Sequence, residues 1–86
     1  MTVDELKNHL ISVFRPIVSA MTDKPENLEI ECRSSDSTTM LSLKSDVSDR
    51  GKLIGKEGRT AQALRTLMHA ICAKHKMKAV LEIIDR

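Results

Sequence analysis

The residues of this chain that could do chemistry are concentrated in one stretch, residues 51–59, which holds all three glycines together with several cations. Gly55 and Gly58 let the main chain adopt positive φ and approach another molecule closely, because glycine has no side chain. We expect the amides of Gly55 and Gly58, and those of the first turn of a helix that begins at Arg59, to point outward at the positive end of the helix dipole, a site suited to a phosphate group. Lys56 and Arg59 add positive charge beside it. The stretch therefore predicts contact with a phosphate-bearing polymer.

Two other interpretations apply to the same glycines. A nucleotide-binding P-loop needs four residues between its glycines and a Ser or Thr after the Lys. Here three residues separate Gly51 from Gly55, and Glu57 follows Lys56, so a P-loop is excluded. A helix-to-helix turn chosen for geometry alone also places glycine at such positions. The local positive charge favours the phosphate interpretation over that one.

Charge and composition limit the class of partner further. The chain of 86 residues has a net charge of +2, but residues 50–78 hold eight of the fourteen Lys and Arg against a single acid, Glu57. One segment is thus cationic on an otherwise acidic chain, which suits an anionic partner. Phe14 is the only aromatic residue. Binding by stacking bases on aromatic platforms, as in RRM-like and most OB-like proteins, is therefore disfavoured.

Catalytic, metal and membrane functions are not indicated. The spacing of His69, Cys72 and His75 suggests metal ligands, but helical steps of about 300° place the two histidines about 120° apart. We therefore predict Cys72 in the core and no metal. No arrangement of Ser, His, Cys or paired carboxylates suggests an enzyme, a cofactor or a small-molecule substrate. Polar residues interrupt residues 1–20 and no apolar run has the length of a membrane span, so we expect a cytoplasmic protein with reduced cysteines.

The elements that must position residues 51–59 follow from the hydropathy pattern. Thr2 and Glu5 have the spacing of a capping box, and apolar residues then recur at helical spacing, which predicts a helix over residues 2–22. Pro16 lies inside this helix, so we expect a kink or a break near residues 14–15.

An antiparallel hairpin is predicted next. Residues 28–32 and 39–43 alternate polar with apolar side chains on either side of a turn at residues 34–37. A short helix over residues 46–53 then leads to the glycine-rich stretch. Its predicted apolar contacts are Val47 and Leu53.

A long helix and a last strand complete the chain. The helix follows Gly58, and the strand covers residues 80–84. The predicted inward stripe of the helix consists of Ala61, Leu64, Leu67, Met68, Ile71 and Cys72. The order α-β-β-α-α-β predicts one two-layer α+β domain with helices on one face of the sheet.

In this setting, the sequence Ile54-Gly55-Lys56-Glu57-Gly58-Arg59 between two helices resembles the GxxG loop of KH domains. Residues 51–61, 64–67 and 80–85 extend the similarity to the small bacterial single-KH RNA-binding proteins of the KhpA family. The resemblance implies a type II KH domain over residues 1–86, with a three-stranded mixed sheet covered on one face by helices. It also implies that the loop clamps the backbone of about four nucleotides of single-stranded RNA, whose bases lie over an apolar groove. The RNA-binding residues that it implies are Lys52, Ile54, Gly55, Lys56, Glu57, Gly58, Arg59, Ala61, Leu64 and Arg65.

The resemblance further implies a non-catalytic RNA chaperone in post-transcriptional regulation, paired as a homodimer or with a larger KH-containing protein and linked to cell-envelope growth and cell shape. Pairing raises the effective concentration of a single weak module. The first helix, Phe14 and the apolar positions around it are candidates for this contact, although their default role is core. Arg50 and Glu57 depart from the family pattern. Arg50 either extends the phosphate track or faces water, and we expect Glu57 to point to solvent. The alternatives are a protein-interaction adaptor that uses the fold as a scaffold and a ribosome-associated assembly factor.

Overall fold

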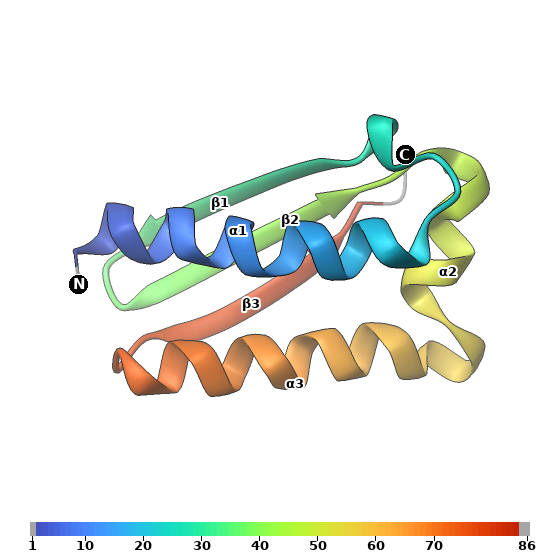
Figure 1. Ribbon diagram of the computed structural model, residues 1–86. Helices are drawn as coiled ribbons and strands as arrows, with labels where there is room; N and C mark the ends of the chain where they lie inside the picture. The colour runs from blue at the N-terminus through green and yellow to red at the C-terminus, as the bar shows by residue number, and fades with distance from the viewer. Residues whose placement is uncertain (1, 85–86) are drawn as a thin grey trace.

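The helices and strands occur in the predicted order, and the computed structural model describes residues 2–84. The elements are α1 (Val3–Met21), β1 (Glu29–Ser35), β2 (Thr38–Lys44), α2 (Arg50–Ile54), α3 (Arg59–Lys74) and β3 (Lys78–Ile83). Figure 1 shows α1 and α3 running along one face of the sheet, with α2 at one end. The predicted α+β class is therefore confirmed. Within residues 2–84, no helix has the length and apolarity that a membrane crossing requires.

The three strands form a mixed sheet in the order β1-β2-β3. β1 and β2 are antiparallel, whereas β2 and β3 are parallel, with Leu41 opposite Leu81. The hairpin turn comprises only residues 36–37, so it is shorter than the predicted residues 34–37. Asp36 has a φ of 52°, and aspartate is one of the few non-glycine residues that tolerate this conformation.

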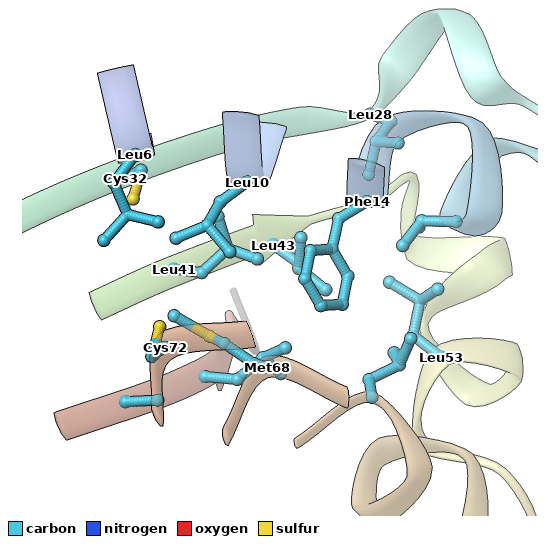
Figure 2. Packing of buried hydrophobic residues seen from close by; sticks show 14 residues of the cluster. Leu6, Leu10, Phe14, Leu28, Cys32, Leu41, Leu43, Leu53, Met68 and Cys72 are labelled. Carbon is cyan, nitrogen blue, oxygen red and sulfur yellow. The ribbon is translucent and has the colours of Figure 1, made fainter. Parts of the chain in front are cut away.

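The core lies between the sheet and the helices. Figure 2 shows Leu10 and Phe14 of α1 directed toward Leu41 and Leu43 of β2 and toward Met68 of α3. None of these five side chains has solvent-exposed surface. Burying a large apolar side chain contributes roughly 1.5–3 kcal/mol, so this layer is a major source of the stability of the domain. Because Phe14 is fully enclosed, its default role in the core is confirmed, and its candidate role as a pairing surface is wrong.

The first helix begins as predicted but is not interrupted. The Thr2 hydroxyl accepts from the Glu5 amide at 3.1 Å and the Glu5 carboxylate accepts from the Thr2 amide at 2.9 Å, which completes the capping box. These hydrogen bonds lower the pKa of Glu5. Pro16 lies within a continuous helix, so of the predicted kink or break, the break is not present. Pro16 and Ser12 are on the exposed side, where water can solvate the carbonyl that loses its helical partner.

The segment that leads to the glycine-rich loop differs from the single short helix predicted over residues 46–53. Val47–Asp49 is one turn of 3-10 helix, and α2 follows it with five residues. The Asp46 carboxylate accepts from the Ser48 amide at 2.9 Å and caps this turn. Val47 points away from the protein and is 70% exposed, so its predicted apolar contact is wrong. Leu53 is fully buried, as predicted.

One residue of the predicted inward stripe on α3 lies outside it. Ala61, Leu64, Met68 and Cys72 are buried, whereas Leu67 is 47% exposed. With 100° per residue, Leu67 lies about 100° around the helix axis from the centre of the buried stripe, which explains its exposure. Leu67 is therefore an apolar side chain on the surface, and the burial of Cys72 agrees with its predicted core position.

Candidate nucleic-acid interface

The loop between α2 and α3 is a tight bend of four residues, Gly55 to Gly58. Gly55 and Gly58 have φ values of 77° and 73°, so the predicted positive φ at both glycines is confirmed. Glu57 between them also has a positive φ, 58°. Glu57 and Gly58, with ψ values of 24° and 15°, are in the left-handed α conformation, which costs a residue with a side chain roughly 1–2 kcal/mol. Gly55, with a ψ of 171°, is in a region that essentially only glycine occupies.

The two glycines differ in the space around them. A Cβ added at Gly55 would lie 2.3 Å from Oγ1 and 2.8 Å from the backbone nitrogen of Thr60. A Cβ added at Gly58 would have no neighbour within 4 Å. Gly55 therefore allows the first turn of α3 to approach the loop closely, while the surface of Gly58 is open to another molecule.

The backbone amides of the loop are only partly available to a ligand. The Gly55 amide donates to the Gly51 carbonyl at 2.8 Å and the Gly58 amide to the Gly55 carbonyl at 3.1 Å. The expectation that the glycine amides point outward is therefore wrong, because they form the bend itself. The amides of Lys56 and Glu57 make no hydrogen bond to the part of the chain that the structure describes. Both residues are exposed, so these two amides are the donors that the loop offers to a phosphate.

Two cations flank these amides. Lys56 is exposed, and the Arg59 guanidinium lies 3.4 Å from the Glu57 carboxylate, with both side chains more than half exposed. Glu57 thus points to solvent, as expected. An exposed pair of this kind contributes little to stability, so Arg59 can exchange Glu57 for a phosphate at small cost.

The predicted apolar groove is smaller than the sequence suggested. Ile54, the last residue of α2, is 40% exposed and lies next to the loop. Ala61 and Leu64 are at most 4% exposed, and Leu64 is part of the core cluster. Ile54 therefore supplies apolar surface beside the loop, whereas Ala61 and Leu64 are too buried to offer a base a surface.

Two further predicted site residues, Arg65 and Lys52, are hydrogen-bonded within the protein. Arg65 is half-buried, and its Nε donates to the Leu81 carbonyl at 3.3 Å, which joins α3 to β3. Lys52 Nζ donates to Asp49 Oδ1 at 3.0 Å and to the Asp23 carboxylate. These bonds raise the pKa of Lys52, first through Asp23 and then through Asp49. The loop cations Lys56 and Arg59 are thus freer to meet an anion than Lys52 is.

Asp49 is a residue of this region that the sequence did not reveal. Its side chain has no exposed surface and accepts hydrogen bonds from the amides of Asp23 at 3.0 Å and Lys24 at 2.9 Å. The bond from the Asp23 amide is the main cause of the lowered pKa of Asp49, and it outweighs the effect of burial. The partners in these two hydrogen bonds are 26 and 25 positions apart in the sequence, and contacts at such separations leave no periodic signal.

No cluster of three or more His, Cys, Asp or Glu that could hold a metal ion occurs within residues 2–84. Two cavities of the described surface lie away from the loop and are lined mainly by strand residues such as Arg33 and Met40. The loop is thus an open, cationic surface and not an enclosed site. This geometry suits the backbone of a flexible polymer.

Comparison with known proteins places the loop inside a matched region. The family described as "KhpA/KhpB, KH domain" matches residues 12–83. The RNA-binding protein KhpA of Borreliella burgdorferi is 37% identical over 75 residues, which cover 87% of this chain and 92% of that protein. The proteins of the same name from Clostridium perfringens and Bacillus subtilis are 40% and 36% identical; they cover 79% and 90% of this chain and 91% and 95% of their own lengths. No solved structure matches the chain significantly.

Proposed function

Since the chain belongs to the KhpA/KhpB family of KH domains, we propose that it binds single-stranded RNA without catalysing a reaction. The observation that carries this proposal is the exposed loop with its two unbonded amides, at Lys56 and Glu57, between the side chains of Lys56 and Arg59. The relatives bear the name RNA-binding protein KhpA, which supports RNA as the ligand.

The loop binds the phosphate backbone, and the adjacent apolar surface accommodates a base. The two amides donate to phosphate oxygens, and Lys56 and Arg59 neutralise their charge. Ile54 offers an apolar contact to a base, but no aromatic residue stands near it for stacking, because Phe14 is in the core. Affinity then comes largely from phosphate contacts, so sequence preference is weak and binding falls as salt rises.

We further propose that the protein acts as a cytoplasmic RNA chaperone in post-transcriptional regulation, as a homodimer or together with a larger KH-containing protein, in the control of cell shape. One domain holds only about four nucleotides, and a second module raises the effective concentration of the first on one strand. With Phe14 enclosed, the surface for pairing comes from exposed apolar residues, of which Leu67 on α3 is 47% exposed. The same exposed side chain supports the second candidate function, a protein-interaction adaptor.

Crosslinking to RNA in cells tests the proposal with a matched pair of variants. Lys56→Glu places a carboxylate in the loop, and Lys74→Glu makes the same change at the exposed opposite end of α3. We expect crosslinking to be lost in Lys56→Glu and retained in Lys74→Glu. Gly58→Asp is a third variant that places a carboxylate in the loop, and we expect it to lose crosslinking as well. Gly58 is chosen because a side chain there has space, whereas a side chain at Gly55 would collide with Thr60.

The outcomes separate the two candidate functions. Equal crosslinking of the parent and a folded Lys56→Glu variant would refute RNA binding by this loop. A parent protein that never crosslinks to RNA but retains a protein partner through Leu67 would support the adaptor instead.

A further inference from the structure

A buried carboxylate connects α2 to the segment that follows α1. Asp49 stands directly before α2, and its Oδ1 and Oδ2 accept from the backbone amides of Asp23 at 3.0 Å and Lys24 at 2.9 Å. Asp49 makes no side-chain capping bond to α2 itself. The carboxylate instead joins the start of α2 to the segment that follows α1. These two parts of the chain are far apart in sequence, and Figure 1 shows them meeting beside α2.

Lys52 completes this arrangement. Its Nζ lies 3.0 Å from Asp49 Oδ1 and is also hydrogen-bonded to the carboxylate of Asp23. The Lys52 side chain is 41% exposed, whereas that of Asp49 has no exposure. A buried carboxylate is costly unless it is paired, so Lys52 supplies the counter-charge for Asp49. If Lys52 moved to a phosphate, Asp49 would keep its two amides but lose this cation.

A second carboxylate ties the same two segments together. Asp46 Oδ2 accepts from Asn27 Nδ2 at 2.9 Å, while its Oδ1 accepts from the Ser48 amide at 2.9 Å. Residues 23–27 are thus joined to residues 46–52 by four hydrogen bonds, two to Asp49, one from Lys52 and one to Asp46. This matters because α2 has only five residues and a helix of that length has little stability of its own. The glycine loop follows directly after the last residue of α2, so the position of α2 sets the position of the loop.

We propose that Asp49 and Lys52 form a positioning pair that fixes α2 and thereby the loop at Gly55, and that Lys52 does not contact RNA. This inference rests on the proposed RNA binding and divides the cations of the site by role. Lys56 and Arg59 contact phosphate, whereas Lys52 acts through Asp49. It therefore reassigns Lys52, which the family resemblance places among the RNA-binding residues.

The salt dependence of RNA affinity distinguishes the two roles. Each phosphate contact that is lost lowers the slope of log affinity against log salt by roughly 0.7 for a single strand. Lys52→Met and Lys56→Met are matched variants, with the same change four positions apart. With an eight-nucleotide uridine RNA as the probe, we expect Lys56→Met to lower the slope by about 0.7. We expect Lys52→Met to weaken binding by the same factor at every salt concentration, with the slope of the parent.

A double-mutant cycle provides the second arm. If Lys52 acts through Asp49, Lys52→Met has little further effect on affinity in an Asp49→Asn background, whereas independent effects add. A Lys52→Met slope that falls as far as that of Lys56→Met would overturn the inference and leave RNA binding intact. A parent protein that binds the probe at no salt concentration would instead refute the proposed function. Lys52→Met alone still decides the matter if Asp49→Asn does not fold.

Discussion

Adding one methyl group at either glycine of the loop is expected to have unequal consequences. In Gly58→Ala the new Cβ has no neighbour within 4 Å, so the cost is that of a left-handed alanine at φ 73°, about 1–2 kcal/mol. In Gly55→Ala the residue would have φ 77° and ψ 171°, a region that essentially only glycine occupies, at a cost of about 1–3 kcal/mol. The Cβ would also lie 2.8 Å from the backbone nitrogen of Thr60. Relieving that overlap moves the start of α3, which adds about 1–3 kcal/mol. We therefore expect a total of about 2–6 kcal/mol for Gly55→Ala.

Urea denaturation followed by circular dichroism measures both free energies of unfolding, since the chain has no Trp or Tyr to report by fluorescence. Gly55→Ala/Thr60→Ala is a useful control. It removes the contact with the Thr60 hydroxyl but not that with the backbone nitrogen, so only part of the stability returns. If Gly55→Ala is no less stable than Gly58→Ala, the close approach of α3 to Gly55 does not have the role assigned to it.

Three further predictions concern the core, the exposed apolar surface and acid stability. Phe14→Ala should lower the free energy of unfolding by about 3–5 kcal/mol because the ring is fully buried; a change under about 1 kcal/mol in urea denaturation would contradict that. Leu67→Glu should change stability by less than about 0.5 kcal/mol, because Leu67 is exposed, but should shift sedimentation toward monomer; unchanged self-association would exclude α3 as the pairing surface. Asp46 has its pKa lowered from 3.8 to about 2, chiefly by the Ser48 amide. Its stabilising effect is therefore complete above about pH 4 and is lost as the pH falls toward 2. Asp46→Asn should flatten the dependence of the free energy of unfolding on pH in that range. An unchanged pH profile would contradict the role assigned to Asp46.

Local patterns predicted the elements of the fold. The capping box at Thr2, the alternation in β1 and β2, and the spacing of Met68 and Cys72 each depend on neighbours close in sequence or on a regular period. The exposure of Leu67 was missed because it depends on which side of α3 meets the sheet, and a shift of one residue turns the helix by about 100°.

The candidate site was predicted less completely, because several of its contacts depend on how the chain folds in three dimensions and not on neighbours in the sequence. Glycine and cation spacing indicated the loop and its left-handed conformation. The internal bonds of the Gly55 and Gly58 amides depend on the three-dimensional path of the bend. The role of Asp49 depends on a contact with Asp23, 26 positions away. At Pro16 the sequence predicted an interruption of the helix that is not present. The helix tolerates the proline because the carbonyl that loses its helical hydrogen bond faces water.

Titration of the isotope-labelled protein with a short single-stranded RNA, followed by amide nuclear magnetic resonance, tests the loop most directly. If the amides of Lys56 and Glu57 donate to phosphate, their resonances should shift most and saturate with the affinity measured independently. Unperturbed resonances at these two residues, with large shifts confined to the open face of the sheet, would show that RNA binds elsewhere.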